Sequence, residues 1–267
     1  MEIIKPRIEL QPYIKAFWAL KACNTGDKCR VQRIIPSGLV ELTFYFNSAP
    51  EYQRYGKSYK VSTVLNGQHT DYYEIRIPES LDMFSVVFSP LGARVFFDFP
   101  MDEIFNQNVP VELLDKKPGN DVAEKIRDTL SFNGRVALLE HYFLNRLQDK
   151  DFWNIKRLVS GLNALSSNGG LISVNELANK ACLSTRQFKR VFSNVIGTTP
   201  KSYARIIRLQ KTLFTGQKQP EKHMTNLAYM CGYADQAHMI NEFKTLTGYT
   251  PRQFFSVCQP YSDFYSM

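Results

Sequence analysis

A short segment of the C-terminal half, TRQFKRVFSNVI at residues 185–196, holds side chains that suit recognition of nucleic acid. Helical spacing predicts that its apolar residues face a core, and these are Phe188, Val191, Phe192 and Val195. The opposite face then carries Arg186, Gln187, Lys189 and Arg190. Guanidinium and ammonium groups can bind guanine O6 and N7 or phosphate oxygens, and a glutamine amide can pair with adenine. The segment therefore predicts a helix that enters the major groove of DNA.

The surrounding pattern occurs a second time further along the chain. LANKACLS, residues 177–184, matches LAYMCGYA, residues 227–234, at an offset of 50. Three further residues recur at an offset of 51: Phe192, Gly197 and Pro200 return as Phe243, Gly248 and Pro251. One extra residue near Asp235 accounts for the change of offset. Matching spacings of this kind indicate an internal repeat.

Each copy contains the parts of a helix-turn-helix unit: a short helix, a tight turn, a second amphipathic helix, a glycine exit and a proline restart. In the first copy Ser173 is expected to cap a helix from Val174 to Ala181, with Glu176 completing a capping box. Ser184 is expected to cap the second helix. The two units span about residues 173–197 and 223–248, and a long helix containing KSYARIIRLQKTLF would join them.

The second copy is expected to present neutral side chains rather than cations. Its second helix begins at Asp235 and buries Met239 and Phe243, and the exposed set is then Gln236, Ala237, His238 and Asn241. Amide groups can pair with adenine, whereas histidine is mostly uncharged at neutral pH. A surface or capping role stays open for His238 and Asn241. We therefore expect the first unit to contribute more of the base discrimination and affinity.

The region from Asn154 to Val257 resembles the AraC/XylS-type regulators, most specifically in the string CGYADQAHMINEFKTLTGYTPRQF. The resemblance implies two helix-turn-helix subdomains, joined by a linker helix, that read two nearby major-groove segments on one face of DNA. It assigns base reading to Arg186, Lys189 and Arg190 in the first unit and to Gln236, His238 and Asn241 in the second. Asn241 stands where arginine is common in the family, and Met239 stands where phenylalanine is common.

The distribution of charge agrees with a polyanion-binding C-terminal domain. Residues 155–258 contain 14 Lys and Arg against four Asp and Glu, a net charge of +10, whereas residues 1–154 have a net charge of −1. A basic domain beside a near-neutral one is typical of proteins that bind nucleic acid. Basic surfaces also occur on proteins that bind acidic partners or membranes, so charge alone does not decide the partner.

The N-terminal half has a different character and predicts a β-rich domain. Short runs rich in Tyr, Phe, Val and Ile are separated by turn residues, and they are YIKAFWALKA, LVELTFYFN, KVSTVLNG, YYEIRI and MFSVVFS. Helical spacing follows in LGARVFFDF, MDEIFNQ, DVAEKIRDTL and ALLEHYFLNRLQ. We predict an α+β protein, with a barrel-like (cupin-like) β-rich domain and trailing helices over residues 1–150 and an all-α tandem helix-turn-helix domain over residues 151–267.

Two N-terminal stretches, IIPSGLVELTFYF and FSPLGARVFFDFPMDEIFNQNVPVELL, resemble uncharacterised β-rich domains that precede this DNA-binding module. The resemblance implies a sensory or dimerising role. The expected partners are therefore double-stranded DNA, a small-molecule effector, a second copy of the chain and RNA polymerase, with no membrane. Lack of a signal peptide or a long apolar stretch favours a cytoplasmic location.

Other function classes find less support in the sequence. No nucleophile motif, phosphate-binding loop or paired-carboxylate signature is present, so we do not expect an enzyme or a cofactor. The histidines are scattered, and no metal site is expected. Cys23 and Cys29 leave open a cysteine-based damage sensor, although such a site would need more thiolates. A non-specific architectural DNA-binding protein is the main alternative, because it would share the basic charge.

Overall fold

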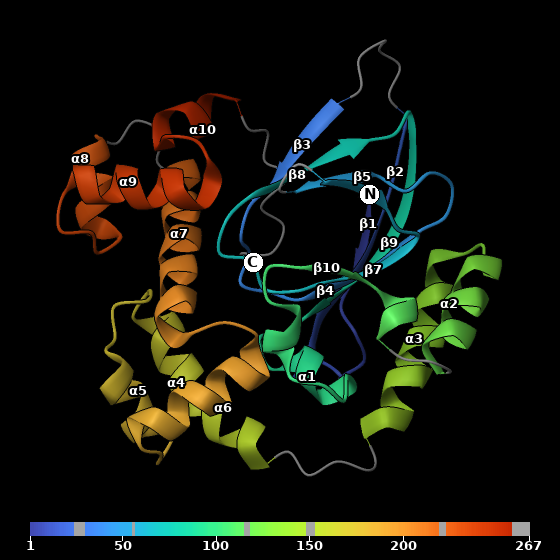
Figure 1. Cartoon of the computed structure of the whole chain (residues 1–267), viewed down its shortest axis with the longest axis horizontal. Coiled ribbons are helices and arrows are strands. Elements are labelled where there is room, and N and C mark those ends of the chain that lie inside the picture. Colours follow the sequence, from blue (N-terminus) through green and yellow to red (C-terminus); the bar gives the residue numbers. More distant parts are fainter. Residues whose placement is uncertain (24–29, 55–56, 115–117, 148–152, 219–222, 258–267) are drawn as a thin grey trace. The chain divides into compact units, whose positions relative to one another are not determined.

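The computed structural model describes residues 1–23, 30–54, 57–114, 118–147, 153–218 and 223–257 (Figure 1). Strands occupy the N-terminal part and helices the C-terminal part, which confirms the predicted α+β class. Contacts divide the chain into two units. The N-terminal unit takes residues 1–33, 39–67 and 73–152, and the C-terminal unit takes residues 34–38, 68–72 and 153–267. No helix in the described ranges is both long and apolar enough to cross a membrane.

The N-terminal unit is built on two antiparallel sheets. The larger has the strand order β1-β2-β9-β4-β7-β10, and its strands are β1 (Glu2–Ile4), β2 (Ile14–Cys23), β9 (Ser80–Phe88), β4 (Glu41–Tyr45), β7 (Thr63–Asn66) and β10 (Asn108–Pro110). The smaller has the order β3-β8-β5-β6, with β3 (Arg30–Ile34), β8 (Tyr73–Ile77), β5 (Glu51–Arg54) and β6 (Lys57–Lys60). Among the described strands neither sheet closes on itself, so the barrel-like domain consists of two open sheets.

The centre of the larger sheet explains why β9 reads as a continuous apolar run. The residues from Phe84 to Phe88 are all buried, and Phe84 stacks against Phe17 of β2 with ring centroids 6.3 Å apart. The buried polar groups nearby are paired across strands. Ser85 Oγ donates to Thr43 Oγ1 at 2.9 Å, and Asn108 Nδ2 donates to Asn66 Oδ1 at 2.8 Å. Such pairing is required of polar groups that have lost contact with water.

Most of the predicted elements of this unit are present. The five predicted strands correspond to β2, β4, β7, β8 and β9. Three of the four predicted helices form as α1 (Gly92–Phe96), α2 (Pro118–Asp128) and α3 (Phe132–Leu147). The fourth, MDEIFNQ, was wrong as a helix: only Met101–Ile104 turns, as a 3-10 helix, because Phe105 leaves the helical region with ψ 128° and Asn106 takes a positive φ of 56°. A second 3-10 turn covers Val111–Leu113.

The C-terminal unit is helical. Its helices are α4 (Trp153–Ser167), α5 (Val174–Lys180), α6 (Thr185–Ile196), α7 (Pro200–Lys218), α8 (Met224–Met230), α9 (Gln236–Thr247) and α10 (Pro251–Val257). The α5–α6 and α8–α9 pairs are the two predicted helix-turn-helix units. Their inward residues pack as the sequence predicts: Phe188 and Phe192 of α6, like Met239 and Phe243 of α9, are at most 1% exposed. Val191 is the exception, being only half-buried.

The repeat extends to the backbone hydrogen bonds of the two turns. Cys182 N donates to Asn179 O and Leu183 N to Ala178 O, both at 3.0 Å. At an offset of 50, Gly232 N donates to Tyr229 O at 3.0 Å and Tyr233 N to Ala228 O at 2.9 Å. The cap of α6 is Ser184 and that of α9 is Asp235, so the extra residue of the second copy is Ala234, next to the predicted position.

The two turns also share a left-handed backbone position that only one of them fills with glycine. Gly232 has φ 81°, and Cys182 has φ 52°. A side chain at such a position costs about 1 to 2 kcal/mol, part of which glycine loses again through its freedom in the unfolded chain.

We expect Cys182→Gly to stabilise the protein by about 0.5 kcal/mol. Gly232→Ala should destabilise it by at least about 1 kcal/mol, because its Cβ would also lie 2.2 Å from Leu171 Cδ1 unless that side chain moves. Midpoints of urea unfolding would measure both changes. Cys182→Ala serves as the control, because it removes the thiol and keeps the strained backbone. A gain in stability from Cys182→Ala equal to that from Cys182→Gly would show that the thiol, and not the backbone, is responsible.

Candidate nucleic-acid interface

The first recognition helix, α6, begins with a complete capping box. Ser184 Oγ accepts from Gln187 N, and Gln187 Oε1 accepts from Ser184 N, both at 3.3 Å. Helix α5 begins in the same way with Ser173 and Glu176, where the hydrogen bonds from Ser173 lower the pKa of the Glu176 carboxyl. Both caps confirm the sequence prediction. The Gln187 amide oxygen is therefore engaged in holding the helix start, which leaves its amide nitrogen for any further contact.

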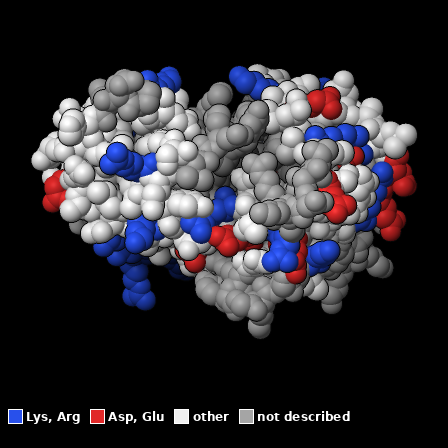
Figure 2. Space-filling model, turned by 90° about the horizontal axis from the view of Figure 1, so that it is seen from above, with Lys and Arg blue, Asp and Glu red and all other residues white. Residues whose placement is uncertain are grey.

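Three cations stand exposed on the outer face of α6, namely Arg186, Lys189 and Arg190. Within the described residues they make no ion pair or hydrogen bond. Positive side chains are more widespread than negative ones over the C-terminal unit in the face drawn in Figure 2. Exposed, uncompensated guanidinium and ammonium groups on the first turns of a helix are suited to contact base edges and phosphates.

The second recognition helix, α9, presents a less available face. Gln236 is half-buried, and its Oε1 accepts from Thr225 Oγ1 at 2.8 Å. Its counterpart in the first unit is Thr185, which donates to Asn175 Oδ1 at 3.0 Å. Both contacts join the two helices of a unit, so the residue at this position holds the unit together. Only the Nε2 group of the Gln236 amide is left for an outside partner.

His238 is exposed yet engaged with its neighbours. Its ring meets Tyr233 edge to face with centroids 5.3 Å apart. Nδ1 accepts a long hydrogen bond of 3.4 Å from Ala234 N, and Nε2 lies 4.0 Å from Glu242 Oε2. An acceptor role for Nδ1 places the ring proton on Nε2, facing the carboxylate. Asn241 is exposed, and its side chain makes no hydrogen bond within the described residues.

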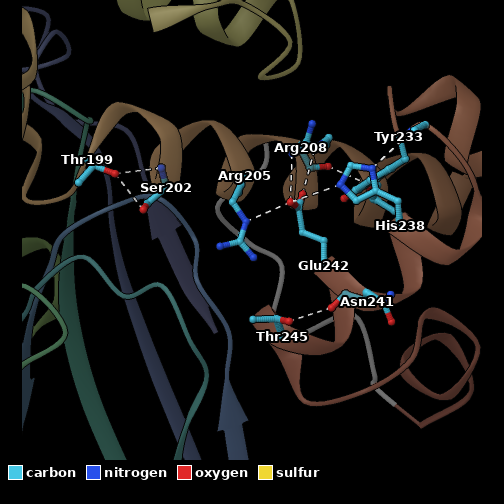
Figure 3. Close-up of polar contacts among 11 residues, drawn as sticks. Thr199, Ser202, Arg205, Arg208, Tyr233, His238, Asn241, Glu242 and Thr245 are labelled. Atoms are coloured by element: carbon cyan, nitrogen blue, oxygen red, sulfur yellow. Dashed lines mark hydrogen bonds and ion pairs between the residues drawn. The ribbon is translucent and has the colours of Figure 1, made fainter.

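A buried carboxylate that the sequence analysis did not single out ties α9 to the linker helix α7 (Figure 3). Glu242 is 8% exposed. Arg205 Nε donates to its Oε2 at 3.0 Å, whereas Arg208 donates through Nε to Oε1 at 2.9 Å and through Nη2 to Oε2 at 3.1 Å. Charge-assisted bonds of this kind are among the strongest in proteins. We call these three side chains the α7–α9 fork.

The ring of Tyr233 closes the fork on one side. The Arg208 guanidinium lies over it, 5.0 Å from the ring centroid. Burial raises the pKa of Tyr233 to about 12, and the nearby Glu242 carboxylate acts in the same direction. The phenol is therefore neutral at physiological pH and serves as packing for the arginine.

Helix α4 binds the turn that joins α5 to α6, although α4 is not part of that helix-turn-helix unit. Arg157 donates through Nε to Ala181 O at 3.3 Å and through Nη2 to Cys182 O, and Ser160 Oγ donates to Lys180 O at 2.8 Å. These groups satisfy carbonyls that the end of α5 leaves without helical partners. The sequence offered no signal for them, because they lie at least 20 residues from their acceptors.

A cleft of about 660 Å³ lies in the C-terminal unit. Helix α9 contributes His238, Asn241, Glu242 and Thr245. Helix α7 contributes Lys201, Arg205 and Arg208, and apolar side chains around the start of α5 complete the wall. Two of the predicted base readers thus share this cleft, whereas the cations of α6 do not line it. In the described residues no cluster of three or more His, Cys, Asp or Glu side chains could hold a metal ion.

The region that contains both recognition helices matches a known protein family. Residues 177–256 match a family model described as a helix-turn-helix domain. The C-terminal unit contains an AraC-type helix-turn-helix domain. Residues 2–110, most of the N-terminal unit, match a family model described as a domain of unknown function, DUF6597.

Curated relatives match the AraC-type domain. The HTH-type transcriptional activator RhaS of Mannheimia succiniciproducens is 33% identical over 82 residues, 31% of this chain and 30% of that protein. An uncharacterised HTH-type transcriptional regulator of Haemophilus influenzae is 31% identical over 118 residues, 44% of this chain and 37% of that protein. The chain thus spans about a third of the length of the curated relatives that it matches.

Among solved structures, ToxT from Vibrio cholerae O395 is similar over 91% of this chain and 98% of its own, with a TM-score of 0.50 and 12% identity. A single-substitution variant of apo ToxT from Vibrio cholerae strain SCE256 gives the same TM-score of 0.50 at 10% identity, over 96% of this chain and 100% of its own. At these identities the likeness shows the fold, a β-rich domain followed by a helical one.

We expect Glu242→Ala to destabilise the C-terminal unit by about 2 kcal/mol. Removing one partner of a buried ion pair costs about 3 to 5 kcal/mol, and partial exposure of the Arg205 and Arg208 side chains, 32% and 15%, reduces that cost. Denaturant unfolding would measure the loss. Glu242→Gln is the matched control and should lose less, because it keeps the shape and one acceptor oxygen. A change below about 0.5 kcal/mol for Glu242→Ala would show that the fork adds no stability.

Proposed function

We propose that this protein is a sequence-specific DNA-binding transcription regulator that acts in the cytoplasm and has no enzymatic role. The observation that carries the proposal is the unpaired cationic face of α6, with Arg186, Lys189 and Arg190, inside an AraC-type domain. Relatives that match this domain are transcriptional regulators or activators. In this proposal α6 and α9 enter successive major-groove segments about one duplex turn apart, or roughly 10 base pairs.

The residues proposed to contact DNA in the first unit are Arg186, Gln187, Lys189 and Arg190. Those proposed in the second are Gln236, His238 and Asn241. Their internal contacts indicate how available each residue is to DNA. The α6 cations have no partner among the described residues, whereas Gln236 already contacts Thr225 and His238 already contacts Glu242 of the α7–α9 fork. RNA polymerase is a further proposed partner, since regulators of this kind act on transcription.

For the N-terminal unit we propose a sensory or dimerising role. A second copy is supported by the edge strand β1, where Ile3 and Ile4 are 54% and 40% exposed. Open strand edges with apolar side chains can pair with another chain. A cavity between the larger sheet and α3 measures about 20 Å³, which is room for little more than one water molecule. A small effector would therefore need this site to open or would bind at the surface.

The cysteine-based alternative rests on Cys23 and Cys29. Cys23 is an exposed free thiol at the end of β2, and Cys29 lies outside the described residues. A non-specific architectural DNA-binding protein is the stronger alternative, since the basic surface would serve it equally well. Sequence preference separates that alternative from the proposal.

The full-length protein is expected to bind duplex DNA with a slope of log affinity against log salt of about −5, as six or so phosphate contacts would give. At physiological salt it should prefer a duplex selected from a random-sequence pool over unrelated duplex by at least about a thousandfold. Fluorescence anisotropy titrations with both duplexes measure the two quantities. Steep salt dependence without preference would identify an architectural binder, and a flat salt response would refute DNA binding.

The two units are expected to contribute unequally to binding. A bidentate arginine contact with guanine contributes about 1 to 3 kcal/mol, so Arg186→Ala and Arg190→Ala should each weaken binding to the selected duplex by about ten- to a hundredfold. Gln236→Ala and Asn241→Ala should each cost less. Circular dichroism and unfolding midpoints control for folding, which matters most for Gln236 because it bonds Thr225. Equal or larger losses from the second pair would show that α9 reads DNA through amide contacts or shape.

A further inference from the structure

The cleft beside α9 combines positive charge with apolar walls. Its lining holds three cationic side chains, Lys201, Arg205 and Arg208, against the single carboxylate of Glu242. The rest of the wall is largely apolar, with Ile172, Val174, Leu177, Pro200 and Ala204. Charges of one sign in a cleft with low-dielectric walls focus the field on whatever enters it. The cleft is therefore built for an anion.

The fork orients one of these cations toward the open space. Arg208 uses both Nε and Nη2 on Glu242, and its guanidinium lies over the ring of Tyr233. Arg205 uses only Nε. Figure 3 shows the two terminal nitrogens of Arg205 turned away from Glu242. A guanidinium fixed at one nitrogen presents its remaining pair in a set direction, which suits two oxygens of a phosphate.

Lys201 adds a second charge on the same face of α7. It precedes Arg205 by four residues, so the two side chains lie one above the other along the helix. Lys201 is exposed and has no ion pair within the described residues. On the facing helix, Asn241 and Thr245 offer polar groups without charge. The anion would thus meet two available positive groups on one wall and neutral groups on the other.

We propose that Lys201 and Arg205 bind a phosphodiester of the DNA backbone that crosses the cleft between the two major-groove segments. This inference rests on the proposed function. Asn241, a predicted base reader, lines the same cleft, so a duplex that meets α9 there brings its backbone to the α7 wall. Phosphate contacts carry no sequence information but fix the register of a protein on the duplex. Lys201 and Arg205 therefore set the register of the second unit.

The first experiment compares full-length Lys201→Ala with Lys156→Ala, the same charge change at an exposed lysine of α4 in the same unit outside the cleft lining. Lys201→Ala should weaken binding to the selected duplex and to unrelated duplex by a similar factor. It should also reduce the magnitude of the salt slope by about 0.9, the loss of one phosphate contact. Lys156→Ala should change the slope by less than half of that. Equal effects of the two variants would overturn the proposal, because general charge would then explain both.

The second experiment locates the phosphate. Neutral methylphosphonate linkages are placed one at a time across the selected duplex, between and beyond the two reading segments. The wild-type protein should lose affinity at one or two linkages between the segments, and Lys201→Ala should lose nothing further there. Arg205→Lys, which keeps the charge near Glu242 but removes the paired terminal nitrogens, should show the same coupling. We call a linkage coupled to Lys201 when it weakens binding of the wild-type protein but not of Lys201→Ala. The absence of any coupled linkage overturns the proposal.

Two outcomes distinguish failure of this inference from failure of the proposed function. If the wild-type protein binds the selected duplex specifically and no linkage couples to Lys201, the cleft assignment fails while the proposed function stands. If no duplex binds, the proposed function fails and the inference with it. Titration with inorganic phosphate at constant ionic strength tests a free anion as the occupant. Saturable binding that Lys201→Ala abolishes, together with uncoupled linkages, would assign the cleft to a small phosphate and overturn the proposal.

Discussion

The α7–α9 fork is the interaction on which the arrangement of the second unit depends. A duplex presents its major groove to one face once per turn, about every 34 Å, so two reading helices must be held at a fixed spacing. Helix α7 supplies that spacing. It meets α6 through the edge-to-face contact of Phe192 with Tyr203, at 5.7 Å, and it holds α9 through the buried carboxylate of Glu242. Apolar packing alone tolerates small slips, whereas a carboxylate with two arginines accepts few geometries.

Elements determined by neighbours in sequence could be predicted. The capping box at Ser173, the cap at Ser184, the glycine exits at 197 and 248 and the inward aromatic residues of α6 all depend on residues within one or two helical turns. The short strands β1, β3, β5, β6 and β10 were not predicted. They are three to five residues long, and they form strands because they hydrogen-bond to the strand beside them. The 3-10 turn at Met101 has helical composition, but the backbone at Phe105 and Asn106 limits it to one turn.

The residues of the candidate site differ in the same way: those placed by nearby residues could be predicted, and those placed by distant contacts could not. Exposure of the α6 cations follows from helical period, so residue types and spacing were sufficient to place them. The engagement of Gln236 with Thr225 and of Glu242 with Arg205 was not accessible, because it joins residues 11 and 37 positions apart. In the first copy the residue equivalent to Glu242 is Val191, an apolar residue of the kind expected at an inward position. Comparison of the two copies would have marked Glu242 as the departure, since a carboxylate at an inward position needs a buried partner.

The positive surface of the C-terminal unit arises as much from the placement of acids as from the number of bases. Residues 155–258 contain only four acidic residues, and Glu221 lies outside the described residues. Each of the other three has an internal partner: Glu176 completes a capping box, Asp235 caps α9 and Glu242 binds two arginines. Acids at helix starts also offset the positive end of the helix dipole. Among the described residues, each negative charge is thus held at a helix start or in the α7–α9 fork, and the cations of α6 and Lys201 remain available to meet a polyanion.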